Sequence, residues 1–369
     1  MLNYRIPLIK PYISERAKTL VNEVLDSGFL TEGPFTRRFE EAVARYTGVP
    51  RAVAFTSCTT GLETALRVAG VRPGDEVIVP DFTYPATANA VQLTGAVPVI
   101  ADIDPATMLI DEDAVEEVIS PATRAIVPVS LFGNPLDYDR LKTIKAKYGV
   151  LIIEDAACAL GSAYRDVPTG VHADMTVFSF HPRKFVTTGE GGMVTTSSRE
   201  WSEALHRYKH FGLGRRPGEK ESQFLAPGTN YKMSDVLAAL GIAQMEEIDM
   251  LLEERRRLAF RYDQLLAEDR NIRIPQTTRH GRHSYQSYAV WVANRDEVMK
   301  KMRKEGIEVQ IGTYSLHRQP AFQEGRARFR GQYPGSLKAF TETLVLPLYH
   351  GMTDAHQTEV VKKLKVCVA

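Results

Sequence analysis

Short apolar segments alternate with amphipathic segments along the first two-thirds of the chain. Strand-like runs are predicted at residues 52–55, 76–80, 97–103, 125–133, 150–155 and 176–180. Helix-like stretches lie between them, such as residues 35–46, whose apolar positions fall on one side of a helix. Strands that alternate with helices in this way favour βαβ units. The pattern predicts an α/β fold in which helices sandwich a mostly parallel sheet.

From about Met233 the pattern changes. Residues 233–266 read as a long helical stretch, with Gly241 and the polar pair at 246–247 as possible breaks. A strand at 285–293, a helix at 295–306 and a strand at 307–312 follow it. The sequence therefore predicts a large α/β domain, residues 1–245, and a smaller C-terminal α+β domain, residues 246–369.

Composition narrows the functional classes. The 369 residues are 44% hydrophobic and 25% charged, as in a globular protein with a sizeable core, and the formal net charge is +1. This charge gives no general attraction to nucleic acid or to an anionic membrane, and no apolar run has membrane-spanning length. The first residues lack the apolar region of a signal peptide. Cys58, Cys158 and Cys367 are too far apart for a zinc motif and fit a reducing compartment, so we expect a cytoplasmic protein.

Four motifs rich in small and polar residues follow predicted strands. They are TSCTTG after 52–55, DFTYPAT after 76–80, EDAACALG after 150–155 and HPRKFVTTGEGG after 176–180. Open parallel sheets bind ligands beyond the carboxyl ends of their strands. The four motifs are therefore expected to meet in one pocket.

Two of these motifs carry a charged residue for which two interpretations stay open. Asp155 can cap the next helix, or it can keep a ring nitrogen protonated. Most lysines are solvated surface charges, but Lys184 follows a buried type of strand and stands among small residues. In that setting a lysine amine can form a Schiff base with an aldehyde.

The other two motifs suit a phosphate and a flat ring. TSCTTG places hydroxyls and free N–H groups at the start of a helix, which can bind phosphate or can be an ordinary N-cap. Tyr84 can stack on a ring or can belong to the core. A lysine, an acid, a phosphate cradle and an aromatic side chain together are the recognition set for pyridoxal 5′-phosphate.

With these motifs the sequence resembles the DegT/StrS-type nucleotide-sugar aminotransferases, within fold-type I of the pyridoxal-phosphate enzymes. The resemblance runs nearly end to end, from SGFLTEGPFTRRFEEAVARYTG to LVLPLYHGMT, and SFHPRKFVTTGEGG is its most specific string. It implies an aldimine on Lys184, which would also move the proton, and a contact of Asp155 with the pyridine nitrogen. Tyr84 would stack on the ring. The residues implied to hold the phosphate are Cys58, Thr59 and Ser179, with Asn230 reaching the phosphate in a partner subunit of a homodimer.

The chain departs from the family pattern at two positions. Cys158 stands where many relatives have a glutamine that approaches the cofactor, and Lys232 stands where arginine is commoner. The segment GTYSLHRQPAF resembles the family's substrate loop, so Tyr314 and His317 are candidate sugar-nucleotide contacts, although His317 can equally be a surface group. The run EERRR at 253–257 is interpreted as an exposed helix face. No metal is expected, because HGRH at 280–283 has no acidic partner nearby.

The resemblance implies a ping-pong aminotransferase of polysaccharide biosynthesis. It would move an amino group from an amino acid, L-glutamate by analogy, to a keto group of a nucleotide-linked sugar. Two alternatives remain at this stage. A branch of the family dehydrates sugars with histidine at the lysine position, which is Lys184 here, and a non-catalytic regulator could keep the fold. No nucleic-acid or membrane partner is expected.

Overall fold

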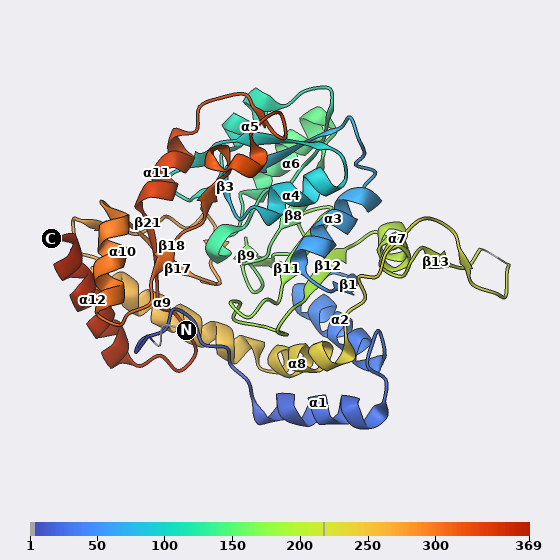
Figure 1. Cartoon of the computed structure of the whole chain (residues 1–369), viewed down its shortest axis with the longest axis horizontal. Coiled ribbons are helices and arrows are strands. Elements are labelled where there is room, and N and C mark those ends of the chain that lie inside the picture. The colour runs from blue at the N-terminus through green and yellow to red at the C-terminus, as the bar shows by residue number, and fades with distance from the viewer. Residues whose placement is uncertain (1–3, 217) are drawn as a thin grey trace.

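The computed structural model describes residues 4–216 and 218–369, and an eight-stranded sheet forms its centre (Figure 1). The strands, in spatial order, are β1 (Arg51–Phe55), β12 (Gly192–Thr196), β11 (Met175–Ser179), β8 (Leu151–Asp155), β7 (Thr123–Ile126), β2 (Glu76–Pro80), β4 (Val97–Ala101) and β20 (Arg328–Phe329). Strand β12 runs antiparallel to both of its neighbours, and the other pairings are parallel. The predicted mostly parallel sheet is confirmed.

Helices cover both faces of this sheet (Figure 1). Helices α3 (Cys58–Val68), α4 (Ala86–Leu93) and α7 (Arg199–Lys209) pack on one face, and α5 (Glu112–Val118) and α6 (Tyr138–Tyr148) pack on the other. Strand β2 shows why. Its residues are all buried, with Val77 and Val79 in the core under α3 and Ile78 in the core under α5. Strands buried on both faces read as continuous apolar runs, which is how they appear in the sequence.

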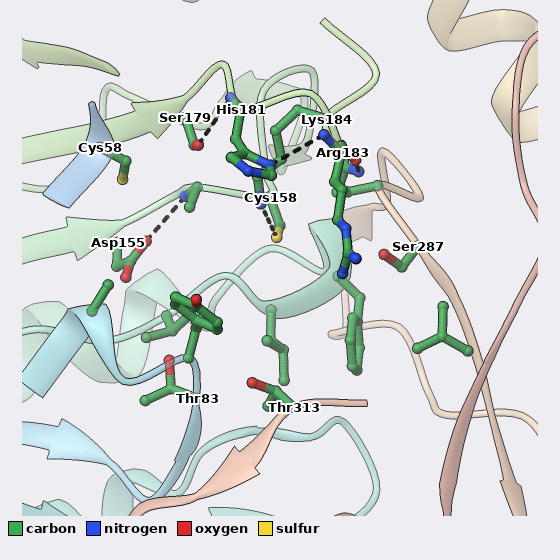
Figure 2. A pocket seen from close by; sticks show the side chains of 18 of the residues that line it. Cys58, Thr83, Asp155, Cys158, Ser179, His181, Arg183, Lys184, Ser287 and Thr313 are labelled. Carbon is green, nitrogen blue, oxygen red and sulfur yellow. Dashed lines mark hydrogen bonds between the residues drawn. The ribbon is translucent and has the colours of Figure 1, made fainter. Parts of the chain in front are cut away.

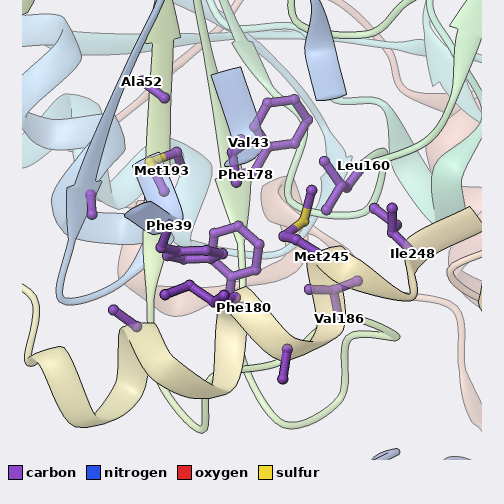
Figure 3. Packing of buried hydrophobic residues seen from close by; sticks show 14 of the residues in the cluster. Phe39, Val43, Ala52, Leu160, Phe178, Phe180, Val186, Met193, Met245 and Ile248 are labelled. Atoms are coloured by element: carbon purple, nitrogen blue, oxygen red, sulfur yellow. The ribbon is translucent and has the colours of Figure 1, made fainter. Parts of the chain in front are cut away.

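A second core lies beneath β1, β11 and β12, where α1 (Glu15–Ser27), α2 (Pro34–Thr47) and α8 (Asp235–Glu246) pack (Figure 3). The rings of Phe39 and Phe180 meet edge to face here, with centroids 4.9 Å apart. The expectation of a helix break at Gly241 is wrong, because this residue lies inside α8. A Cβ at Gly241 would come within 2.5 Å of the Phe39 ring, so its glycine serves close packing. The other predicted break, at the polar pair 246–247, is confirmed: α8 ends at Glu246 and α9 (Ile248–Leu266) begins after Glu247.

The C-terminal part builds a smaller antiparallel sheet with its own core. Its strands, in spatial order, are β15 (Ile272–Arg273), β17 (Tyr288–Val292), β21 (Thr343–Leu346) and β18 (Gln310–Ile311). Helices α9, α10 (Arg295–Lys304) and α12 (Asp354–Val368) pack against it, and α11 (Pro334–Glu342) lies toward the large sheet. No helix of residues 4–216 and 218–369 combines the length and apolarity needed to cross a membrane.

The chain crosses between the two parts in both directions. Ile6 is fully buried in the C-terminal core and pairs with Ile307. In the other direction β20 joins the large sheet beside β4, where Arg330 donates to buried Glu76 at 2.6 Å. The division at residue 245 therefore stays a prediction.

The strand expected at 125–133 is shorter than predicted. Strand β7 ends at Ile126, and residues 131–133 form a short 3₁₀ turn with Phe132 at φ 58°. Pro128 has no N–H to donate to a neighbouring strand, which is consistent with the early end of the ladder. Val129 keeps an isolated backbone pairing with Asp155, after which the chain leaves the sheet. Val129, Leu131 and Phe132 line the cavity at its edge.

The remaining short strands belong to loops. Their bounds are β3 (Phe82–Thr83), β5 (Ile103–Asp104), β6 (Leu109–Ile110), β9 (Ala163–Tyr164), β10 (Val167–Pro168), β13 (Leu213–Gly214), β14 (Gln223–Phe224), β16 (Gly281–Arg282) and β19 (Tyr314–Ser315). The β13–β14 hairpin projects from the body of the molecule beside α7 (Figure 1).

Candidate active site

A cavity of about 580 Å³ opens at the carboxyl ends of the large sheet, between that sheet and the C-terminal part (Figure 2). Strands β1, β2, β8 and β11 run in one direction and deliver their following segments to it. Seven of the predicted site residues line it: Cys58, Thr59, Tyr84, Asp155, Cys158, Ser179 and Lys184. The expectation that the four motifs meet in one pocket is confirmed.

Asp155 ends β8, and this residue, which lines the cavity, is 5% exposed. Thr87 donates a hydrogen bond to Oδ2 at 2.8 Å, and the Ala157 amide donates to Oδ1 at 3.1 Å. Burial raises the pKa of Asp155, and these hydrogen bonds and nearby Lys184 only partly oppose the shift. A buried, oriented carboxylate of this kind can hold a protonated ring nitrogen.

Glu154, next to Asp155, is fully buried away from the cavity. Ser130 and Tyr138 donate to its Oε1 at 2.5 and 2.7 Å, yet burial raises its pKa to about 7. Because folding raises this pKa, protonated Glu154 stabilises the fold at low pH, and the contribution is lost as the pH rises through about 7.

We therefore expect Glu154→Gln, which stays neutral, to gain stability relative to the natural protein as the pH rises. The free energy of unfolding of the variant minus that of the natural protein should become more positive by on the order of 1–3 kcal/mol between about pH 5 and about pH 8. Urea unfolding at the two pH values measures this, with Glu41→Gln on the exposed side of α2 as the control. An identical difference at both pH values would contradict the prediction.

Lys184 lies in the turn that follows β11, and its side chain is half-buried. Its Nζ donates to Cys158 Sγ at 3.1 Å (Figure 2). Burial lowers the pKa of Lys184, but the neighbouring Cys158, Cys58 and Asp155 outweigh this and raise it. Cys158, which replaces the expected glutamine, thus contacts the lysine amine directly.

The backbone around Lys184 is clamped by Gln286, which the sequence analysis missed. Its Nε2 donates to the Arg183 carbonyl at 2.6 Å, and its Oε1 accepts from the Phe185 amide at 3.0 Å. The Gln286 carbonyl in turn accepts from buried Arg255 at 2.7 Å. Arg255 is 2% exposed, so the interpretation of EERRR as an exposed face is wrong at this position. No motif marks Gln286, because its role depends on contacts about a hundred residues away.

The first turn of α3 forms the opposite wall of the cavity. Ser57 caps the helix by accepting from the Thr60 amide, which leaves the amides of Cys58 and Thr59 without an intrahelical acceptor. A Cβ at Gly192 would lie 2.3 Å from the Ser57 carbonyl oxygen, so only glycine lets β12 approach this turn so closely. Burial raises the pKa of the Cys58 thiol, which stays neutral, and Ser179 adds a hydroxyl. These groups suit a phosphate.

Tyr84 lies at the rim of the cavity and is 66% exposed. Its ring centroid is 6.3 Å from that of Tyr314, whose backbone pairs with Thr83 through β19 and β3. Tyr314 is therefore beside the cavity without lining it. An exposed ring at this rim is free to stack on a ligand.

His317 and Asn230 lie outside the residues that line the cavity. The His317 amide and Nδ1 contact the carboxylate of fully buried Asp81 at 2.7 and 2.6 Å, and its ring stacks on Tyr333. This arrangement fastens the 314–322 loop to the end of β2. Asn230 is exposed and accepts from Lys232 Nζ at 2.7 Å. The substrate and partner roles of these residues stay predictions.

The residues of the cavity fit pyridoxal phosphate. The cavity offers an amine for the cofactor's aldehyde, a buried carboxylate for its ring nitrogen, and free helix amides for its phosphate. The contact between β12 and α3 that requires Gly192 keeps the amide cradle clear of side-chain atoms.

Comparisons with known proteins agree with this geometry. Residues 11–365 match the model of the DegT/DnrJ/EryC1/StrS aminotransferase family. The chain is 35% identical to the GDP-perosamine synthase of Caulobacter vibrioides over 98% of this chain and 97% of that one. It is 34% identical to the UDP-4-amino-4-deoxy-L-arabinose–oxoglutarate aminotransferase of Shewanella sediminis, over 91% and 90%.

A solved structure shares the fold along the whole chain. It is a putative sugar aminotransferase from Streptococcus pneumoniae in its PMP-form, with a TM-score of 0.93, 31% identity and 99% of both chains covered. A PLP-form of the same protein matches with a TM-score of 0.92. The chain belongs to the DegT/DnrJ/EryC1/StrS aminotransferase family and is a pyridoxal-phosphate-dependent enzyme of that family.

Proposed function

We propose that this enzyme moves an amino group from L-glutamate to a keto group of a nucleotide-linked sugar, in a polysaccharide pathway. The observation that carries the proposal is one cavity that holds a lysine amine, a buried carboxylate and a helix N-terminus. Two relatives support the substrates by their names, one a GDP-perosamine synthase and the other an oxoglutarate aminotransferase of a UDP-linked amino sugar. Oxoglutarate is the keto acid that glutamate leaves behind.

The residues of the cavity divide the work. When bound, pyridoxal phosphate supplies an electron sink for the charge left when the donor's α-carbon loses its proton. Asp155, oriented by Thr87 and the Ala157 amide, holds the ring nitrogen in its protonated form. Lys184 would hold the aldehyde carbon of the cofactor, and its amine, when free, would be the base that accepts the proton of the donor's α-carbon and the acid that gives it back.

The remaining groups position the cofactor. Cys58, Thr59 and Ser179 offer amides, a thiol and hydroxyls to the phosphate, and Tyr84 stacks on the ring. Cys158 holds the Lys184 amine when that amine is not bonded to the cofactor.

The proposal includes a homodimer in which Asn230 reaches the phosphate of the neighbouring subunit. Asn230 is exposed, and its backbone pairs with His210, shortly before β13 of the projecting hairpin. Two large apolar side chains are exposed in the same region: Phe211, whose amide donates to the Thr229 carbonyl, at 48%, and Phe224 in β14, at 73%. Exposed apolar groups of this size favour an interface. We expect a dimer in light scattering of the pure protein, and a monomer that transfers amino groups at full rate would contradict this part.

The visible absorption spectrum tests the function. Protein loaded with pyridoxal phosphate should show the yellow band of the lysine-bound cofactor, L-glutamate should bleach it, and 2-oxoglutarate should restore it. D-Glutamate is the control, because its α-proton points away from the catalytic amine. If L-glutamate leaves the band unchanged, the proposed donor is wrong. If the bleached band is restored by none of the GDP-linked or UDP-linked keto sugars that are added, the proposed acceptor class is wrong.

A further inference from the structure

One cation in the wall of the cavity has no role in holding the cofactor. Among the described residues that line the cavity, the positive side chains are Lys184, Arg183 and, when protonated, His181, and the negative ones are Asp155 and Glu190. The Lys184 amine would be taken up in holding the cofactor's aldehyde carbon, and Asp155 would face the ring nitrogen. His181 loses most of its positive charge at neutral pH, since burial lowers its pKa. Arg183 is then the permanent cation left in this wall.

Arg183 is held in a defined position by three hydrogen bonds. Its amide donates to His181 Nδ1 at 3.2 Å, and its carbonyl accepts from Gln286 at 2.6 Å. Its Nη1 donates to Gln310 Oε1 at 2.9 Å. Gln310 is in β18 of the small sheet, so the guanidinium bridges the two walls. Figure 2 shows the Arg183 side chain across the cavity from Asp155, with Cys158 between them.

The guanidinium has no carboxylate partner within the described part of the chain. No carboxylate oxygen of those residues lies within 4.0 Å of it, and its side-chain tether, Gln310, is neutral. Arg257 and Arg330, by contrast, pair with acids at 2.9 and 2.6 Å. Most of the five N–H donors of Arg183 remain free, in the planar fork that matches a carboxylate.

We propose that Arg183 binds the carboxylate of the amino-acid donor, an assignment that rests on the proposed function. An amino acid carries its carboxylate on the carbon that bears the reacting amine, so the carboxylate must sit next to the site of Lys184. The diphosphate of a nucleotide-linked sugar is separated from a ring keto carbon by the sugar itself. Arg183 adjoins Lys184 in the chain and in the same wall, which favours the carboxylate.

Arg183 then acts as the positioning and specificity residue of the donor step, and Gln310 orients it. Amines without a carboxylate should be poor donors, because they cannot make the charge-assisted hydrogen bonds that this exposed guanidinium offers. The small sheet contributes to donor recognition through Gln310, although the cofactor contacts come from the large sheet.

The test compares Arg183→Gln and Arg183→Lys with the natural enzyme and with Arg45→Gln, an exposed arginine of α2 outside the cavity. The L-glutamate concentration that half-saturates bleaching of the yellow band should rise about 10- to 100-fold in Arg183→Gln, the loss expected for hydrogen bonds to a charged group. Arg183→Lys should recover part of it, because the charge stays and the fork is lost. The equilibrium Kd of 2-oxoglutarate, by calorimetry, should rise in parallel, and the Kd of UDP and of GDP should change less than about twofold.

The other outcomes are equally definite. Weaker UDP or GDP binding with unchanged 2-oxoglutarate binding would overturn the proposal in favour of a diphosphate subsite. Equal losses for all three ligands, or a loss of the yellow band before any donor is added, would show a structural role only. A natural enzyme that L-glutamate does not bleach would refute the proposed donor itself, whereas bleaching with unchanged half-saturation in Arg183→Gln would refute only the role of Arg183.

Discussion

Lys184→Ala should abolish the yellow band and lower amino transfer by about 10⁴-fold, the largest effect that we expect from a single substitution. In the proposed function this side chain would supply both the bond to the aldehyde carbon and the base that moves the α-proton, and general acid–base catalysis alone is worth roughly 10²–10⁴-fold. The fold should survive, because Lys184 is half-buried and its side chain donates one hydrogen bond, to Cys158. The measurement is the release of 2-oxoglutarate from L-glutamate in a single turnover, with the absorption spectrum recorded before the donor is added.

Lys142→Ala on the exposed side of α6 is the matched control and should retain both the band and the rate. Thermal unfolding of Lys184→Ala should stay within a few degrees of the natural protein. A variant that keeps a tenth of the rate would exclude Lys184 as the proton carrier.

Asp155→Asn should lower the transfer rate by roughly 10²–10³-fold, the cost of removing one preorganised group that stabilises developing charge. Asparagine keeps the shape and can accept from Thr87, but it cannot hold a proton on a ring nitrogen. Because burial raises the pKa of Asp155, its ionised form costs stability at neutral pH, and the neutral amide removes that cost. We therefore expect a slower enzyme whose cofactor-free form is as stable as the natural protein, or more so.

Steady-state rates and urea unfolding at neutral pH measure the two effects. Asp139→Asn, at an exposed ion pair with Arg165, serves as the control for loss of a carboxylate. A loss of activity that merely follows a loss of stability would reject the assigned role, as would a rate above half of the natural one.

The strand ends could be predicted from the sequence because local pattern and fold agree there. Strand β2 reads as an unbroken apolar run since both of its faces are buried, and the polar motif after it marks the sheet edge. Lys184 and Asp155 were recognisable because their neighbours along the chain, small residues and a strand, already describe a cavity edge. The shared carboxyl-end edge then brings them together.

Other features depended on distant contacts that no local pattern reveals. Gly241 looked like a helix break, but its lack of a side chain makes room for Phe39 on another helix. Arg255 looked exposed within a charged run, yet it donates to the carbonyls of Tyr285 and Gln286. His317 is fastened by Asp81, 236 residues away, so its position on the loop gave no indication of that contact.

The two crossings of the chain between the large sheet and the C-terminal part limit where the gene of such an enzyme can be divided. Ile6 completes the C-terminal core, and β20 covers the edge of β4. A gene cut at the middle of the helical stretch would yield one fragment with an exposed strand edge, prone to association, and another with a gap in its interior. A chimera of two relatives joined at this point would therefore need matching surfaces at both crossings, where Ile6 enters the C-terminal core and β20 pairs with β4. Substitutions within the intact chain, for example at Gln310 in the cavity wall, leave both crossings in place.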